Sequence, residues 1–404
     1  MKVKKFSIVK QGSVTTPLGF VSCGISAGIK KQRKSDLALI VSEVSALAAG
    51  TFTTNQVKAA PVRVSREHLK AENARAILAN SGNANACTGV QGIGDAKEMT
   101  NLAAMMLGCR ETEVFICSTG RIGRLLPMEK VRRGISRAVK SLNREGGHTT
   151  AKAIMTSDSV EKELAVRFKI GNKTIHIGGC AKGAGMIDPN MATMLAFITT
   201  DAAIDRKTLT RCLHNAVEQS FNRICVDGDM STNDTVLILA NGLAKNPMLK
   251  SYHPELDLFQ SALNFVTREL AKKIVLDGEG VTKFVTIAVK GAANAREAKA
   301  VADAISHSCL VKTAWAGSDP NWGRLMAALG YSSAKIREEL VDIYYDGLLV
   351  VRNGKQTNFP TAKLKRIVSK PSFQITIHLH LGEAEHMIYT SDLTEAYVQL
   401  NMSE

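Results

Sequence analysis

The sequence predicts a layered α/β protein in which helices cover sheets. Along the chain, segments whose apolar residues recur every three to four positions alternate with segments that have the two-residue spacing or the short apolar runs of strands. Such alternation is typical of helices packed on sheets. The 404 residues are enough for two to four domains or for two large intertwined layers. No repeat and no Pro-rich or Ser-rich linker divides them.

Helices are expected where an apolar stripe is bounded by residues that begin or end helices. The stripe from Met99 to Met106 stops at Gly108, and glycine favours the left-handed conformation found at helix ends. Pro127 suits the first turn of a helix, and the stripe from Val131 to Leu142 follows it. Three further helices are expected near residues 206–220, 256–274 and 294–307.

Strands are expected where apolar residues run together or alternate with polar ones. Residues 112–118 (TEVFICS) predict a buried strand. Residues 164–177 alternate on both sides of Gly171-Asn172, which predicts a hairpin with its turn at that pair. Later strands are expected at residues 195–199, 235–240, 285–289 and 373–381.

Composition and charge argue against several classes of function. The net charge of +15 suits nucleic acid, an acidic surface or small anionic substrates. The charge is scattered, however, and aromatic residues make up only 5% of the chain, too few for a surface on which single-stranded bases stack. We therefore expect no nucleic-acid partner.

Two further features bear on the cellular compartment. No segment approaches the ~18 consecutive apolar residues of a membrane span, so we expect no membrane partner and a cytoplasmic location. The eight cysteines include no C-x-x-C pair of the kind that binds zinc or forms a redox dithiol. We expect them to be reduced thiols.

Three motifs that could hold a cofactor or metal fail on inspection. The glycine-rich segment from Gly178 to Gly185 matches neither common phosphate-binding pattern. The segment beginning at Asp227 lacks the glycine and the glutamate of a calcium loop. His378 and His380 share a strand face, but no third ligand lies near them in the sequence. The sequence therefore predicts neither a cofactor nor a metal.

Polar, small-residue strings between apolar runs mark the candidate site. Any one of them could be a tight turn, but four together favour a functional site, because function concentrates in loops on a rigid scaffold. They are residues 80–89 (NSGNANACTG), 118–123 (STGRIG), 182–195 (KGAGMIDPNMATML) and 221–234 (FNRICVDGDMSTND).

With these strings the sequence resembles the ornithine acetyltransferase family, the glutamate N-acetyltransferases of arginine biosynthesis, which cut themselves at an Ala-Thr bond. Further matching motifs carry the resemblance from about residue 36 to the end of the chain, in order. They are residues 36–40 (DLALI), 49–55 (AGTFTTN), 59–62 (AAPV), 153–158 (AIMTSD), 277–283 (DGEGVTK) and 319–324 (DPNWGR).

The resemblance implies that Thr193 is the nucleophile and that the chain cuts itself between Ala192 and Thr193. It implies a layered α/β sandwich like that of the self-processing aminopeptidases, and two chains, 1–192 and 193–404, that form one intertwined unit. A threonine hydroxyl is a weak nucleophile, but cleavage frees an α-amine with a pKa near ~8 that can act as its base. The family usually assembles as a heterotetramer with two copies of each chain.

The resemblance also assigns the remaining site residues. Thr119 and Gly120 would form the oxyanion hole, the set of donors that stabilises the developing negative charge of acyl transfer. Substrate would contact Thr156, Lys182, Thr193, Glu279 and Asn401. Of these, Lys182 can pair with a carboxylate and Glu279 with the amine of ornithine. Two residues depart from the usual pattern, namely Arg121 and Asp188.

The implied reaction moves acetyl from N-acetylornithine to glutamate without metal or cofactor, with acetyl-CoA as a possible co-substrate. Three alternatives remain open at this point. One is a self-processing aminopeptidase or amidase of related architecture, in which water replaces glutamate. Another is an ornithine acetyltransferase of a specialised pathway, and the third is a basic binding protein with no catalytic activity.

Overall fold

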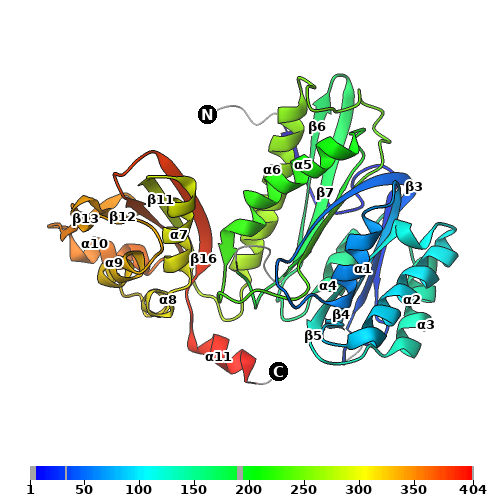
Figure 1. Ribbon diagram of the computed structural model, residues 1–404, viewed down its shortest axis with the longest axis horizontal. Coiled ribbons are helices and arrows are strands. Elements are labelled where there is room, and N and C mark those ends of the chain that lie inside the picture. Colours follow the sequence, from blue (N-terminus) through cyan, green and yellow to red (C-terminus); the bar gives the residue numbers. More distant parts are fainter. Residues whose placement is uncertain (1–5, 32–33, 189–193, 403–404) are drawn as a thin grey trace. The chain divides into compact units, whose positions relative to one another are not determined.

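The computed structural model describes residues 6–31, 34–188 and 194–402 (Figure 1). The chain divides into two compact units, and each takes several separate segments of the sequence. Unit 1 comprises residues 1–183, 190–222 and 230–274, and unit 2 comprises residues 184–189, 223–229 and 275–404.

Unit 1 is built on a nine-stranded sheet. Its strands are β1 (Phe6–Val9), β2 (Phe20–Ile25), β3 (Leu37–Phe52), β4 (Ala74–Asn83), β5 (Val114–Arg121), β6 (Lys162–Ile170), β7 (Lys173–Lys182), β8 (Leu195–Thr200) and β10 (Thr235–Ala240). Its α-helices are α1 (Ala60–His68), α2 (Gly89–Leu107), α3 (Met128–Lys140), α4 (Gly147–Ile154), α5 (Arg206–Glu218) and α6 (Leu256–Leu276), with 3-10 turns η1 (Glu111–Glu113) and η2 (Phe221–Arg223).

In this sheet, strands that follow residue 193 in the sequence lie between strands that precede it. The order is β1-β6-β7-β8-β10-β3-β4-β5, with β2 paired to β3. Strands β8 and β10 follow residue 193 in the sequence, yet they lie between β7 and β3, which precede it. Main-chain hydrogen bonds on both flanks therefore join the segments before and after this residue into one sheet.

Helices cover both faces of the sheet in unit 1, because successive side chains of a strand point to opposite faces. On β3, Leu37 and Leu39 pack with α1, α2 and α3, whereas Ala38 and Ile40 pack with α4. The blue and cyan helices α1, α2 and α3 lie together beside their strands in Figure 1. The alternation of successive side chains along each strand thus gives unit 1 two hydrophobic layers, one on each face of the sheet.

Unit 2 is a seven-stranded sheet with helices packed against it. Its strands are β9 (Ile224–Cys225), β11 (Phe284–Ala292), β12 (Asp342–Tyr345), β13 (Leu348–Arg352), β14 (Lys355–Gln356), β15 (Ser372–His378) and β16 (Ala384–Ser391). Its helices are α7 (Ala295–Ser306), α8 (Cys309–Ala316), α9 (Trp322–Gly330), α10 (Thr361–Val368) and α11 (Glu395–Asn401), with the 3-10 turn η3 (Glu338–Leu340).

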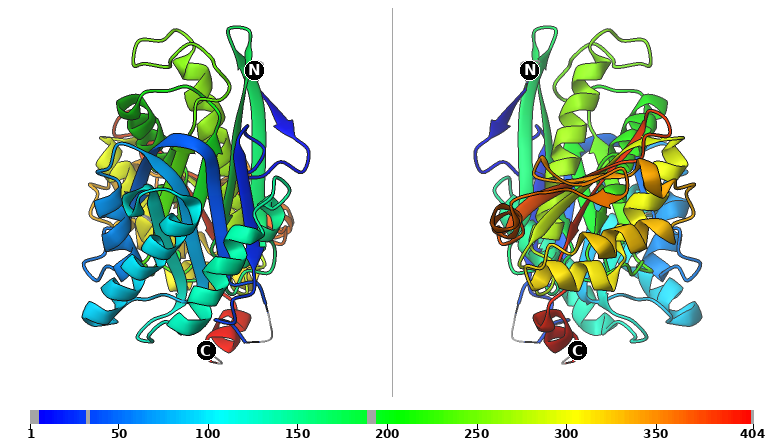
Figure 2. Two further views of the ribbon diagram at one scale, coloured as in Figure 1. Left: turned by 90° about the vertical axis from the view of Figure 1, so that its right-hand side faces the viewer. Right: turned by 90° about the vertical axis from the view of Figure 1, so that its left-hand side faces the viewer.

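The core of unit 2 lies between this sheet and helices α7 to α10. The strand order is β14-β13-β12-β15-β11-β16-β9. Inward side chains of the strands, such as Ile287 and Ile375, pack with Val301 of α7 and with Trp315 of α8. The right-hand view of Figure 2 shows the orange and red strands with these yellow helices beside them.

The layered α/β class is confirmed, and most expected elements appear near their predicted bounds. Helix α2 ends at Leu107, and its C-cap is Gly108, whose φ of 65° is left-handed. The hairpin β6–β7 turns at residues 171–172. Strand β5 begins later than predicted, at Val114, because a 3-10 turn occupies residues 111–113. The N–H of Arg110 donates to the Glu113 carboxylate and so closes this turn.

One helix is shorter than its apolar stripe suggests. Helix α3 ends at Lys140, with Ser141 as its C-cap, so Leu142 lies outside it although the stripe continues that far. No described helix is long and apolar enough to cross a membrane.

Candidate functional site

Two of the polar strings lie side by side at the ends of parallel strands. Strand β4 pairs with β5 in parallel, with Ser81 opposite Thr119 and Gly82 opposite Gly120. The carboxyl ends of parallel strands meet at one edge of a sheet, where binding residues collect in α/β proteins. The strings that begin at residues 80 and 118 therefore share one edge of unit 1.

Gly120 is required at this edge by the close approach of the two backbones. Its φ is +128°, a conformation that other residues rarely adopt. A Cβ atom at this position would lie 2.4 Å from the carbonyl carbon of Gly82 and 2.6 Å from the nitrogen of Asn83. Any side chain here would separate the strands, so the close pairing of these two strand ends depends on glycine at residue 120.

Thr119 presents its hydroxyl from the same strand end. The residue is only 3% exposed, yet its hydroxyl has no hydrogen-bond partner among the described residues. Its neighbour Ser118, in contrast, donates from Oγ to Oδ1 of Asn80 at 2.6 Å. Thr119 can therefore donate a hydrogen bond to a ligand without breaking one that it already makes. Arg121 follows on the exposed side of the strand end.

A third string docks onto this edge through Asn233. Its Nδ2 donates to the carbonyl of Ser118 at 2.8 Å and to that of Ala84 at 2.7 Å. The Thr232 hydroxyl donates to Oδ1 of Asn233 at 2.6 Å, which fixes the orientation of the amide. One side chain thus ties the ends of β4 and β5 to the segment that leads into β10.

The next residue, Asp234, holds the start of β8. Its Oδ1 accepts the N–H of Met194 at 2.9 Å, and Leu195 then pairs with Thr235. Asp234 is fully buried, and burial raises the pKa of its carboxyl well above the ordinary value. Consecutive side chains at 233 and 234 therefore connect the oxyanion candidates with the residue that directly follows Thr193.

The predicted nucleophile Thr193 and its neighbour Ala192 lie outside the described residues. Of the 182–195 string the structure describes residues 182–188 and 194–195.

A buried carboxylate, Asp158, links two further motifs of unit 1. Its Oδ1 accepts from the N–H of Gly183 and from the ammonium of Lys162, both at 2.7 Å. Its Oδ2 accepts from the N–H of Thr156 at 2.9 Å and lies 3.9 Å from the ammonium of Lys182. The predicted substrate residues Thr156 and Lys182 are therefore brought together by this side chain.

The electrostatics around Asp158 favour its charged form. Burial alone would raise its pKa, but the charges of Lys182 and Lys162 together hold it below the ordinary range. A further lysine, Lys30, donates to the carbonyls of Met155 and Ser35 at 2.7 and 2.9 Å. Burial lowers the pKa of Lys30 to about 8. Buried cations beside the residue 156 loop suit an anionic substrate group.

Asp36 of the DLALI motif fixes the loop that carries Lys30. Asp36 is fully buried. Its carboxylate accepts the backbone N–H groups of all four residues from Ala27 through Lys30. Its own carbonyl accepts the N–H of Ser81 at 2.9 Å. The loop that carries Lys30 is thereby folded against the end of β4.

The remaining two predicted substrate residues meet in unit 2. Nδ2 of Asn401 donates to Oε2 of Glu279 at 3.0 Å. A Cβ atom on Gly185 would lie 2.5 Å from the Glu279 carboxyl carbon, so a side chain at this position of the KGAGM string would displace the Glu279 carboxyl group. Gly280 likewise approaches the backbone of Tyr397 in α11. The two glycines therefore allow the acid to lie against main chain.

Sequence reasoning assigned no role to Asp158, Asn233 or Asp234, although all three lie in the quoted motifs. The residues are polar and almost completely buried, which is unusual for their types. Each has a partner distant in sequence, namely Ser118 for Asn233, Met194 for Asp234 and Gly183 for Asp158. A local pattern therefore carried no signal for these contacts.

The sequence is similar to known proteins over nearly its whole length. The sequence matches the ArgJ family over residues 21–403. It is 48% identical to the arginine biosynthesis bifunctional protein ArgJ of Symbiobacterium thermophilum, covering 97% of this chain and 98% of that protein. It is 47% identical to the glutamate N-acetyltransferase of Methanocaldococcus jannaschii, covering 97% and 98% of the two chains.

A solved structure is also similar in sequence. The ornithine acetyltransferase of Mycobacterium tuberculosis in complex with ornithine is 38% identical over 46% of this chain and 98% of the solved chain, with a TM-score of 0.43.

The Asp158 network predicts a pH-dependent loss of stability. The Asp158→Asn variant should lose about 3 kcal/mol or more of unfolding free energy at neutral pH, because it breaks a buried ion pair. The folded pKa of Asp158 is lowered, so the carboxylate stabilises the fold above its ordinary pKa of about 3.9 and ceases to do so as the pH falls through its lower folded value.

Urea unfolding at a series of pH values tests this expectation. The difference between wild type and Asp158→Asn should shrink below about pH 4. Exposed Glu129 provides the control, since Glu129→Gln should change stability by less than about 0.5 kcal/mol at any pH. A difference that stays constant down to the lowest pH would contradict the assignment.

Proposed function

Because the chain belongs to the ArgJ family, we propose that it moves acetyl from N-acetylornithine to glutamate through an ester on Thr193. The chain is an enzyme of arginine biosynthesis, with the ornithine acetyltransferase or glutamate N-acetyltransferase activity of its relatives. The observation that best supports the finer mechanism is the pair Asn233 and Asp234, which joins the Thr119 strand end to Met194.

The first step is cleavage of the chain. The hydroxyl of Thr193 attacks the carbonyl of Ala192, the Ala-Thr peptide bond gives way to an ester, and water then hydrolyses that ester. Cleavage leaves Thr193 with a free α-amine, which takes the proton of its own hydroxyl during catalysis. Support comes from the Asp234 carboxylate, which fixes the backbone of the next residue.

Acyl transfer then proceeds in two halves. Thr193 attacks the acetyl carbonyl of N-acetylornithine, and ornithine leaves after its nitrogen takes a proton from the Thr193 amine. The α-amine of glutamate next attacks the acetyl ester, releasing acetylglutamate and restoring the hydroxyl. The first half exchanges an amide for an ester and the second exchanges the ester for an amide, so no oxidation state changes and no redox cofactor takes part. Acetyl-CoA, a thioester, is the other donor that this chemistry admits.

Thr119 and Gly120 stabilise the oxyanion in both halves. A Thr119 hydroxyl with no partner among the described residues and a backbone held at Gly120 by its contact with Gly82 meet the requirement for preorganised donors. Donors that need no rearrangement act more strongly than water does on developing charge.

Charged side chains select the substrates in this proposal. Lys182, with the Thr156 loop, binds a substrate carboxylate, and the buried position of this lysine strengthens such a pair. Glu279 binds the side-chain amine of ornithine, with Asn401 orienting its carboxylate through the 3.0 Å hydrogen bond.

We further propose that chains 1–192 and 193–404 stay together after cleavage and assemble as a heterotetramer in the cytoplasm. The insertion of β8 and β10 between β7 and β3 supports the first point, because separating the chains would break pairing on both flanks. All eight cysteines are free, as is usual in a reducing compartment.

Product analysis tests the reaction itself. Purified protein supplied with N-acetylornithine should release ornithine and acetylglutamate in equal amounts, and only when glutamate is present. Acetate released at the same rate without glutamate would favour the amidase alternative. The same assay with acetyl-CoA as donor decides whether the thioester is used.

Self-cleavage predicts two chains in denaturing mass spectrometry. Their summed mass should exceed that of the 43.5 kDa precursor by one water, and the second chain should begin Thr-Met-Leu-Ala-Phe. Thr193→Ala should stay uncut and inactive, since it lacks the attacking hydroxyl. Fully active protein that remains a single chain would rule the mechanism out.

The oxyanion assignment predicts an effect on turnover rather than on binding. Thr119→Ala should lower kcat by ~10²-fold or more with little change in KM, because the interaction forms only in the transition state. Thr119→Ser keeps the hydroxyl and should retain most of the activity. If Thr119→Ala raised only KM, the residue would be a ground-state contact instead.

The Glu279 assignment predicts a loss that depends on the substrate. Glu279→Gln keeps size and hydrogen bonding but removes charge, so kcat/KM for N-acetylornithine should fall by ~30-fold or more. A donor that lacks the side-chain amine should be almost unaffected. Equal losses for both donors would show that Glu279 has a structural or catalytic role.

A further inference from the structure

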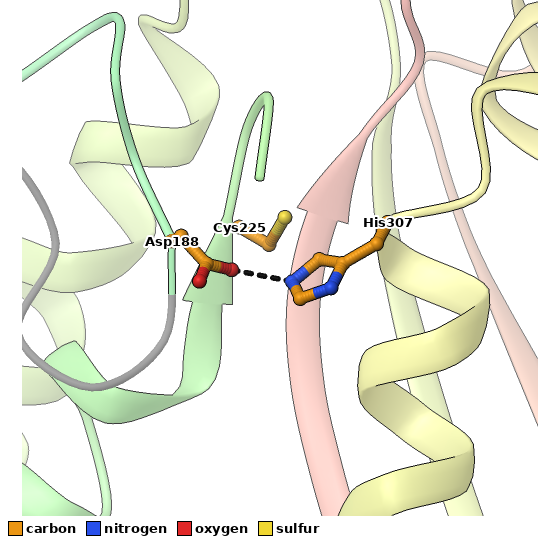
Figure 3. A group of neighbouring side chains, drawn as sticks. All are labelled: Asp188, Cys225 and His307. Atoms are coloured by element: carbon orange, nitrogen blue, oxygen red, sulfur yellow. Dashed lines mark hydrogen bonds and ion pairs between the residues drawn. The ribbon is translucent and has the colours of Figure 1, made fainter. Parts of the chain in front are cut away.

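Three side chains of unit 2 converge at a place that the acetyl transfer does not use. Asp188 comes from the segment before Pro189, Cys225 from β9 and His307 from the end of α7 (Figure 3). One carboxylate oxygen, the Cys225 sulfur and one imidazole nitrogen lie within 4.8 Å of one another. Nε2 of His307 and Oδ1 of Asp188 form a hydrogen bond.

This donor set matches zinc-type cations rather than hard ones. Thiolate and imidazole are the ligands that zinc prefers, and a single carboxylate can complete a three-ligand site. Calcium or magnesium would require more oxygen ligands than the cluster supplies. Thiolate and carboxylate together carry two negative charges, which neutralise a divalent cation.

The distances require only a small adjustment. Ligands about 2.0–2.3 Å from a tetrahedral zinc ion lie about 3.5 Å from one another, and the three atoms already lie within 4.8 Å. On binding, the cation replaces the proton shared by Asp188 and His307 and the proton of the Cys225 thiol. Both protons leave to solvent, as is usual when such ligands bind metal.

The backbone around two of the ligands is already fixed. The N–H of Val226 donates to the carbonyl of Ile187 at 2.8 Å. The carboxylate of Asp227 accepts the N–H groups of Met186 and Ile187 at 2.7 and 2.8 Å. The residues next to Asp188 and Cys225 are thus joined side by side, so forming the site costs little further ordering.

The cluster is also accessible from one side. Cys225 is fully buried, but the side chain of His307 is 40% exposed. An ion can therefore enter past the imidazole, and a water can occupy the fourth position. Figure 3 shows the three side chains pointing toward one another from separate segments.

We propose that Asp188, Cys225 and His307 bind one zinc-type divalent cation. The ion links three segments of unit 2 and takes no part in acetyl transfer. No motif search reveals this site, because the ligands are separated by 37 and 82 residues.

Cobalt(II) titration of the metal-free full-length protein tests the proposal. One Co²⁺ should bind per copy of the 404-residue protein, counted as one pair of chains 1–192 and 193–404 after cleavage, with a thiolate-to-cobalt charge-transfer band and the intense visible bands of tetrahedral coordination. Zn²⁺ should displace it, whereas excess Mg²⁺ should not. Wild-type protein that shows no thiolate-to-cobalt band would overturn the proposal and leave the cluster as an Asp188–His307 ion pair beside a buried thiol.

Variants identify the ligands. Cys225→Ser should abolish the charge-transfer band, and His307→Gln should weaken Co²⁺ binding by at least ~10-fold. His307 is the most exposed ligand, so its variant tests the site even if Cys225→Ser fails to fold. Cys309→Ser is the matched control, because Cys309 is an exposed thiol two residues beyond His307, and it should keep the band. A band lost in Cys309→Ser but kept in Cys225→Ser would place the metal elsewhere and refute the proposal.

Discussion

The arrangement of unit 1 depends on two consecutive buried side chains, Asn233 and Asp234. The amide holds the ends of β4 and β5 through the carbonyls of Ala84 and Ser118, and the carboxylate holds the first residue before β8. Since both side chains belong to one short segment before β10, the strand edge that carries Thr119 and the start of β8 cannot move independently. Main-chain pairing of β8 with β10 extends the same constraint into the sheet.

Buried charge is the second constraint, and each buried ion of this region has partners of opposite charge or polarity. Asp36 is surrounded by four backbone N–H groups, and Asp158 by two lysines and two N–H groups. An unpaired buried charge would cost several kcal/mol, so these contacts must form together. Asp158 lies 3.9 Å from the ammonium of Lys182 and so places a buried carboxylate beside the lysine that is proposed to bind a substrate carboxylate.

The two units use glycine for the same physical purpose. In unit 1, Gly120 lets one strand backbone approach another, and in unit 2, Gly185 and Gly280 let the chain pass close to Glu279 and Tyr397. Gly120 of the STGRIG motif, Gly185 of KGAGM and Gly280 of DGEGVTK therefore lie at close contacts, whereas Gly123 of STGRIG has open space around it and a positive φ of 80°.

The sequence by itself determined the layered α/β class, the bounds of strands such as β10, the hairpin at residues 171–172 and the end of α2, because each depends on local periodicity or on one turn residue. It also located the strings at residues 80–89 and 118–123, since small polar residues after an apolar strand are a local signal. Tertiary structure alone decided that Asn233 reaches Ser118, that Asp158 gathers Lys182 with Thr156, and that Asp188 lies beside His307. Each of these contacts joins residues that only sheet order or the packing of separate segments brings together, and a buried polar side chain is recognised only once its burial and its distant partner are known.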